Sequence, residues 1–318
     1  MMLVSLLMSV AIPQTFGAHA LLFAGSYVTI QLGRHSFLAF VAAERGTLER
    51  ERAVRILIYF CIAGVFWISG ALVDESLRVL LWLVALAVDY GGGLVLFWVP
   101  GMRRMEGANW SVGVEHFAER FGLFIILALG ESIVLTGVIT SGMDLTPARI
   151  AAFVTAFLGA AAIWWLYFTS VAPTGEHYLE VSEDRVILAR DTYTYLHVVF
   201  AAGIILSAVG DELVIAHPTK VLPPYEVAAV AAGPTVYLLA HTLFGYRPTG
   251  SVTARKVIAT LACVAIGFAG LLLPALVLAG LLLLVLGALI LSSYLLPWPS
   301  GEGAEASKRP DGAATGRL

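Results

Sequence analysis

Long apolar stretches, separated by short polar ones, run along almost the whole chain. A transmembrane helix needs about 20 mostly apolar residues, and several windows of the sequence meet that need. They lie at roughly 18–40, 53–73, 77–99, 117–140, 147–170, 191–215, 226–246, 255–272 and 274–296. The pattern predicts an all-α fold, a polytopic transmembrane helix bundle with about nine full spans.

The first apolar run, residues 1–12, is too short to cross a hydrocarbon layer of about 30 Å. A secretory signal is the alternative, because an Ala-His-Ala tripeptide follows at 18–20. Signals normally begin with Lys or Arg, and no such residue precedes Arg34. We therefore expect a shortened membrane span at the N-terminus.

Composition supports a membrane protein. Hydrophobic residues make up 59% of the 318 residues and charged ones only 13%, against about 25% charged in soluble domains. The net charge is −3 and no basic stripe occurs, so nucleic acid is not an expected partner, whereas the lipid bilayer is. We expect one transmembrane domain over residues 1–297 and a disordered cytoplasmic tail over 298–318, where Gly, Ala and charged residues dominate.

Lys and Arg in the connections predict the orientation, because they accumulate on the cytoplasmic side. With ten segments, one side collects fourteen of these residues and the other only three, namely Arg78, Arg149 and Lys220. The connections are short except for 171–190. The chain is thus expected to be a multipass protein of the prokaryotic inner membrane with both termini in the cytoplasm.

Ionisable residues inside the span that begins near 116 are the first functional candidates. Placing an ionised side chain at bilayer depth costs at least about 2.5–3.5 kcal/mol of free energy. Such residues are therefore expected to be paired, hydrated or required for function. At 100° per residue, His116, Glu119, Arg120 and Glu131 share a sector about 120° wide. Glu131 lies about 18 Å along the axis from Glu119. The alternative is an interfacial ion-pair cluster that only seats the helix.

Asp89 is a second candidate, in the middle of another apolar span and followed by Gly91, Gly92 and Gly93. The glycines favour either a break in the helix or a close helix contact, and broken helices at bilayer depth line ion and substrate sites. Arg34 is a plausible ionic partner for Asp89 or Glu119. The alternative is a packing seam with Asp89 bonded to a neighbouring Arg.

The span 191–215 carries Tyr193 and His197, four residues apart and hence on one helix face, near its inner end. Glu212 lies near its outer end. His116, His197 and His241 fall at similar inner depth, which is compatible with a proton relay or a vestibule. A lone membrane histidine is otherwise a hydrogen-bonded packing residue.

Motifs of known chemistry are missing from the sequence. There is no phosphate-binding loop, no His-Glu-x-x-His zinc motif and no Gly-x-Ser-x-Gly elbow. Cys61 and Cys263 lie inside apolar runs and are expected to pack there. The sequence therefore indicates no metal site, names no cofactor and favours a non-enzymatic role.

The chain resembles the bacterial low-temperature-requirement A family of multipass membrane proteins. The resemblance rests on the His-x-x-Glu-Arg block at 116–120 with Leu-Gly-Glu at 129–131, the Trp-Trp-Leu-Tyr-Phe block at 164–168, and Tyr195-x-His197 with Gly-Asp-Glu at 210–212. It covers roughly residues 2 to 297. Family members usually open with an acidic, Phe-rich block and two earlier spans, so we expect either an upstream start or a truncated copy. Thr169 stands where the family usually has an acidic residue.

The resemblance implies location and fold and no reaction, so the function rests on the intramembrane polar residues. We expect a transporter or channel-like protein for a small solute or ion, with Glu131 and Asp89 responding to protons or cations. The alternatives are a membrane sensor or scaffold, an intramembrane lipid-modifying enzyme and haem-carrying electron transfer through His197 with His241 or His116.

Overall fold

The computed structural model describes residues 1–103 and 114–295, and side chains of the second range from residue 118 onward. The described residues form helices joined by short turns. They contain no strand and one isolated β-bridge, between Val221 and Pro274. The chain divides into two compact parts, unit 1 (Met1–Ser111) and unit 2 (Val112–Leu318). The expected single domain stays a prediction, and the expected disordered tail lies outside the described residues.

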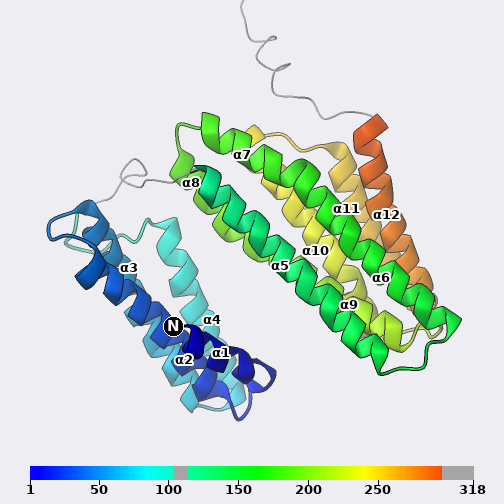
Figure 1. The fold of residues 1–318 in the computed structure, drawn as a ribbon, viewed down its shortest axis with the longest axis horizontal. Helices are drawn as coiled ribbons and strands as arrows, with labels where there is room; N and C mark the ends of the chain where they lie inside the picture. Colours follow the sequence, from blue (N-terminus) through cyan, green and yellow to red (C-terminus); the bar gives the residue numbers. More distant parts are fainter. Residues whose placement is uncertain (104–113, 296–318) are drawn as a thin grey trace, which may run out of the picture. The chain divides into compact units, whose positions relative to one another are not determined.

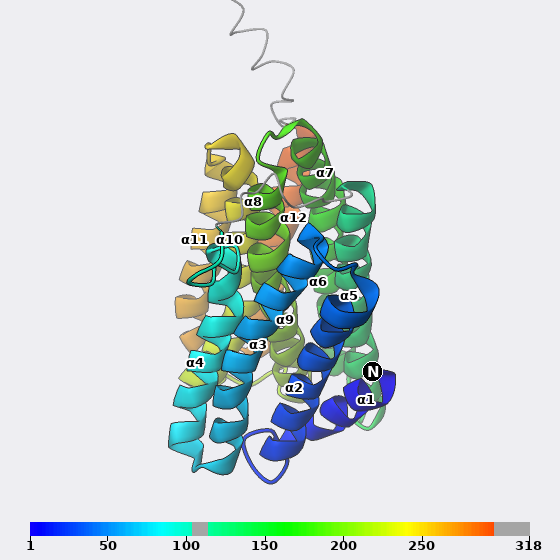
Figure 2. The same ribbon diagram turned by 90° about the vertical axis from the view of Figure 1, so that its left-hand side faces the viewer.

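Unit 1 consists of α1 (Met2–Ala11), η1 (Ile12–Gln14), α2 (Ala20–Phe37), the π-helical η2 (Leu38–Ala42), α3 (Leu48–Leu72) and α4 (Glu75–Leu94). Helices α2, α3 and α4 lie side by side (Figure 2). Trp67 and Trp82 pack at 5.3 Å between ring centroids in the core, surrounded by small alanines. Asp74 caps α4 by accepting a hydrogen bond from the Leu77 N–H.

Unit 2 is the larger helical unit (Figure 1). Its elements are α5 (Val114–Ser141), α6 (Pro147–Leu166), the π-helical η4 (Tyr167–Val171), α7 (Ala172–Val181), α8 (Arg185–Ala189), the π-helical η5 (Arg190–Leu196), α9 (His197–Ala216), α10 (Pro224–Thr249), α11 (Ala254–Ala269), η6 (Gly270–Leu272) and α12 (Ala275–Leu295). Its apolar core runs along the contacts of α5, α6, α9, α10 and α12.

The number of spans differs from the predicted nine. Among the residues described, eight helices are long and apolar enough to cross a membrane, and the N-terminal helix over Met2–Gln14 is shorter, as predicted. The missing span is the window 18–40. It is helical as α2, but Gln31, Arg34 and His35 make its second half too polar.

The predicted long connection at 171–190 is mostly helix. Helix α6 continues without interruption through η4 into α7, and only residues 182–184 separate it from α8, η5 and α9 (Figure 1). The candidate span Pro147–Val181 has 35 residues, which at 1.5 Å per residue is about 52 Å. Because the hydrocarbon layer is about 30 Å thick, this continuous helix is longer than one crossing needs.

Close approach of α9 and α10 depends on glycine. A Cβ placed on Gly203 would lie 2.7 Å from the Tyr237 backbone nitrogen, and one on Gly210 would lie 2.9 Å from the Val230 Cα. Contacts with backbone cannot be relieved by rotating a side chain. These glycines therefore fix the spacing of the two helices that carry the buried His197 and His241.

Candidate functional site

The two π-helical segments of unit 2 meet at a hydrogen bond between Tyr167 and His197. The Tyr167 hydroxyl lies 2.8 Å from His197 Nε2, and His197 Nδ1 lies 2.9 Å from the Thr192 carbonyl. Because a carbonyl can only accept, Nδ1 carries the proton. In the neutral ring Nε2 therefore accepts, and the Tyr167 hydroxyl donates to it. Both side chains are almost fully buried.

Aromatic rings surround the His197 imidazole on several sides. Tyr193 stacks on it with ring centroids 5.0 Å apart and planes 10° apart, as the predicted spacing of four implied. Phe121 of α5 approaches to 4.7 Å, and Phe200 and Phe244 add edge contacts. These contacts on several sides restrict the rotation of the imidazole.

His241 forms a second buried contact with η4. Its Nε2 lies 2.6 Å from the Ser170 hydroxyl, and its carbonyl accepts a hydrogen bond from the Lys256 ammonium at 3.4 Å. Tyr167 and Ser170 thus connect the same π-helical turn to α9 and to α10. A π-helical turn inside an α-helix is uncommon and is frequently found at functional sites.

A pocket of about 450 Å³ opens beside this junction, and we call it the η4 pocket. Its wall includes two acidic residues, Glu119 and Glu176, and two tyrosines, Tyr167 and Tyr193. Phe168 and small or aliphatic residues of α5 and α7 complete the wall. All of these residues belong to unit 2, so the pocket is a feature of that unit alone.

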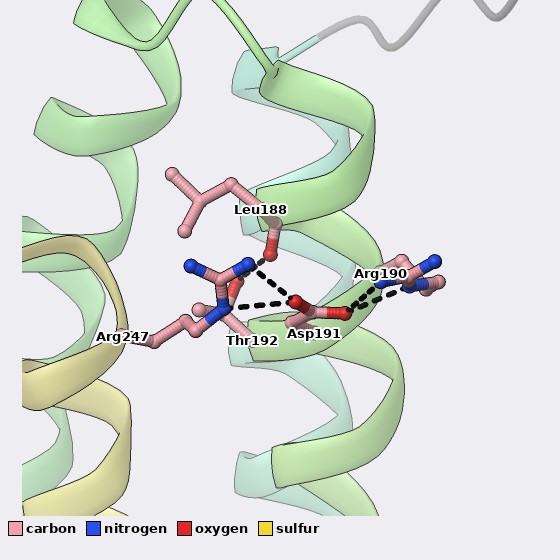
Figure 3. Close-up of polar contacts among 5 residues, drawn as sticks. All are labelled: Leu188, Arg190, Asp191, Thr192 and Arg247. Atoms are coloured by element: carbon pink, nitrogen blue, oxygen red, sulfur yellow. Dashed lines mark hydrogen bonds and ion pairs between the residues drawn. The ribbon is translucent and has the colours of Figure 1, made fainter. Parts of the chain in front are cut away.

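Asp191 links η5 to the end of α10 (Figure 3). One of its carboxylate oxygens accepts from Arg190 Nε at 2.7 Å, and the other from Arg247 Nε at 2.8 Å. Thr192 beside it donates to the Leu188 carbonyl. The carboxylate thus joins η5 to the end of α10 through two guanidinium groups.

The predicted cluster on α5 is only partly brought together. The face of α5 that packs in unit 2 carries Gly122, Ile125, Leu129 and Ser132, and the charged sector lies opposite. Glu119 reaches the rim of the η4 pocket.

The remaining members of that cluster lie apart from the pocket. Arg120 and Glu131 are exposed and do not line it. His116 lies in the first turn of α5, and its side chain is outside the described part of the structure. Of the predicted residues, Glu119, Tyr193 and His197 therefore gather at one place.

Asp89 has different partners from those considered in the sequence. Its Oδ2 accepts hydrogen bonds from the Tyr27 hydroxyl at 2.9 Å and from Trp67 Nε1 at 3.0 Å. Arg34 is exposed near the end of α2 and forms no ion pair with Asp89. Neutral donors from two neighbouring helices thus take the place of the expected guanidinium.

Helix α4 is not broken after Asp89 but continues through the three glycines to Leu94. Gly92 instead allows a close helix contact, which was the other role expected for these glycines. A Cβ there would lie 2.7 Å from the Tyr59 ring.

Of the two acidic residues at 211 and 212, the one that faces the core is Asp211 and not the Glu212 selected from the sequence. Glu212 is exposed, whereas Asp211 lines a small cavity in the core of unit 2. Helical spacing contains the signal that we missed. At 100° per residue, Asp211 lies about 20° from the buried Phe200 and Ile204, whereas Glu212 lies about 120° and 80° from them.

Within the described residues, no group of three or more His, Cys, Asp or Glu side chains is placed to hold a metal ion. The polar groups at the η4 pocket are instead hydrogen-bond donors and acceptors. The arrangement can bind a polar or charged solute and can hold or pass a proton between Tyr167 and His197. It offers no activated nucleophile.

Eight apolar helices with polar side chains in their contacts define a multipass α-helical membrane protein, which resides in a lipid bilayer. A family model described as bacterial low temperature requirement A protein (LtrA) matches residues 1–291. The chain belongs to this family, and the resemblance noted in the sequence is confirmed. A bacterial protein of this architecture is a multipass protein of the inner membrane.

One similar protein is an uncharacterized protein of Rhizobium meliloti (strain 1021), 32% identical over 252 residues. The match covers 79% of this chain and 61% of the relative, so the chain spans about three-fifths of that relative's length. No solved structure matches the chain.

Proposed function

We propose that the protein is a transporter or channel-like protein for a small cationic solute or ion, which binds in the η4 pocket. The observation that carries the proposal is the pocket itself, a cavity of about 450 Å³ with two carboxylate residues in its wall, where two π-helical segments meet. Helices that only seat themselves in lipid need no such cavity. The proposal applies to this chain, which covers part of the length of its relative.

The chemistry of the lining favours a cation. Glu119 and Glu176 contribute carboxylates, and no Lys, Arg or His lines the pocket among the side chains that the structure describes. Tyr167, Phe168 and Tyr193 add aromatic rings, whose faces attract cations. The volume of about 450 Å³ lies within the range of small-molecule sites.

His197 acts in this proposal as a positioning residue. It does not line the pocket but holds the hydroxyl of Tyr167, and its ring stacks on Tyr193. Protonation of Nε2 would turn that atom from an acceptor into a donor and force the Tyr167 hydroxyl to reverse. A proton on His197 would thus change the pocket wall, which links solute binding to protons.

We further propose that the η4 pocket opens on the cytoplasmic side and that both chain termini lie there. The α7 end of unit 2 carries Arg185, Arg190 and Arg247, whereas the opposite end carries Arg149 and Lys220. The excess of Arg at the α7 end supports this orientation.

Flux through reconstituted protein tests the proposal. Proteoliposomes on a solid-supported membrane would be exposed to concentration jumps of Na⁺, K⁺, ammonium, choline and putrescine, and the current recorded. We expect a current with at least one cation and its loss in the Glu119→Gln/Glu176→Gln double variant. Glu180→Gln is the matched control, because Glu180 lies on α7 but outside the pocket.

No current with any of these cations would contradict cation transport. An equal current in the double variant would show that the η4 pocket is not the transport site. A wild-type protein that binds but does not move solute would favour the sensor alternative.

A further inference from the structure

A second polar cavity lies deeper in unit 2, and we call it the Asp211 cavity. It has a volume of about 40 Å³, room for roughly one ion or water, among α5, α6, α9, α10 and α12. Its polar lining is the Asp211 carboxylate and the hydroxyls of Ser132, Thr155 and Ser207. A smaller neighbouring space shares Asp211 and Ser132 and adds Thr136.

The Asp211 cavity is separate from the η4 pocket. The two share no lining residue. Asp211 follows His197 by fourteen residues of α9, which is about 21 Å along the helix. The cavity is therefore a second site on the same helix face.

The hydroxyls around Asp211 present oxygen lone pairs to the cavity. Ser207 donates its proton to the Gly203 carbonyl at 2.9 Å, and Thr155 donates to the Ala151 carbonyl at 2.8 Å. Because a hydroxyl has one proton and two lone pairs, each of these oxygens can accept but not donate further. Acceptor oxygens of this kind suit a cation.

A backbone oxygen adds to this set. Val230 and Pro234 both line the cavity from α10. Proline has no N–H, so the Val230 carbonyl lacks its usual helical donor four residues on. Oxygen ligands of this kind are those that hard cations prefer.

Charge balance indicates a single positive charge. No Lys, Arg or His lines the cavity from any of the five helices, and no ion pair joins Asp211 within the described residues. An isolated carboxylate at this depth is neutralised by a proton or by a bound cation. A hydrated divalent ion would exceed the volume and leave excess charge.

We propose that Asp211, Ser132, Thr155 and Ser207 bind Na⁺, which competes with a proton for the carboxylate. Binding stands without the proposed transport function, and it supplies a coupling ion if that function holds. The two can therefore fail separately.

Thermal unfolding of the purified protein in detergent tests this inference, because a ligand of the folded state raises Tm in proportion to ln(1 + [L]/Kd). NaCl is titrated against choline chloride at constant ionic strength. We expect Tm to rise by several degrees with Na⁺ at pH 8 and by less at pH 5.5, where protons compete. Asp211→Asn should abolish the rise, and Glu212→Gln, the exposed neighbour, should keep it.

Ser207→Ala keeps the carboxylate and removes one ligand oxygen, so it should shift the Na⁺ dependence to about tenfold higher concentration. This variant decides the matter if Asp211→Asn does not fold. No Na⁺-dependent rise in the wild type, or the same rise in Ser207→Ala and Asp211→Asn, would overturn the proposal. The Glu119→Gln/Glu176→Gln variant should retain the full rise.

Discussion

The hydroxyl of Tyr167 lies 2.8 Å from Nε2 of His197, and each residue stands where its helix changes between α- and π-helical geometry. The bond joins two segments 30 residues apart in the chain. It lies directly behind the η4 pocket, whose wall includes the Tyr167 side chain. Local backbone irregularity and a buried polar pair thus occur together at the site proposed for solute.

Removing the Tyr167 hydroxyl should destabilise unit 2. In Tyr167→Phe the buried Nε2 of His197 loses its donor, and an unsatisfied buried acceptor costs about 1–3 kcal/mol. We expect a lower Tm in detergent. Tyr225→Phe is the matched control, because Tyr225 is 73% exposed, and it should leave Tm unchanged. Equal Tm values for both variants would mean that the Tyr167–His197 bond adds nothing to stability.

The contact between α9 and α10 should not tolerate a methyl group at Gly203. The added Cβ would meet backbone atoms of Tyr237, and overpacking of this kind costs about 1–3 kcal/mol. Gly287→Ala on α12 is the control, because nothing lies within 4 Å of a Cβ there. We expect Gly203→Ala to lower Tm and Gly287→Ala to maintain or raise it. The reverse order would contradict the helix spacing.

Asp89 should behave as a structural acceptor in unit 1. Asp89→Ala leaves the Tyr27 hydroxyl and Trp67 Nε1 without their acceptor, at about 1–3 kcal/mol for each donor. Asp89→Asn keeps one acceptor oxygen and should be less destabilised. Tryptophan fluorescence during unfolding measures both variants. Wild-type stability of Asp89→Ala would show that these bonds contribute nothing.

The Asp191–Arg247 ion pair should contribute little to global stability. Arg247 is about half exposed, and exposed pairs are worth about 0–1 kcal/mol. A double-mutant cycle with Asp191→Ala and Arg247→Ala should give a coupling energy in that range, decreasing with added salt. A coupling energy several times larger would mean that the pair is shielded from water.

The helices themselves could be predicted from the sequence, because lipid requires long uninterrupted apolar segments. The gathering of Tyr193 and His197 followed from their spacing of four. The choice between Asp211 and Glu212 was also available, since the helical angles from Phe200 and Ile204 separate them. Treating Asp211 and Glu212 as one acidic pair concealed the fact that they lie on different helix faces.

Other features could not be predicted from the sequence pattern. The π-helical segments at 167–171 and 190–196 leave no periodicity of their own, because each adds one residue to an otherwise regular helix. The partners of Asp89 are Tyr27 and Trp67, residues 62 and 22 positions away. Only the packing of unit 1 brings them together.

The central claim is that the η4 pocket holds water within an otherwise lipid-embedded unit. Thiol labelling tests it directly, in a Cys61→Ser/Cys263→Ala background, with Leu123→Cys in the pocket wall and Leu284→Cys on α12. Both leucines are exposed, at 58% and 68%, but only Leu123 lines the pocket. A charged methanethiosulfonate reagent needs water and an ionised thiol. The account predicts fast modification of Leu123→Cys and none of Leu284→Cys, and equal protection of both positions would contradict it.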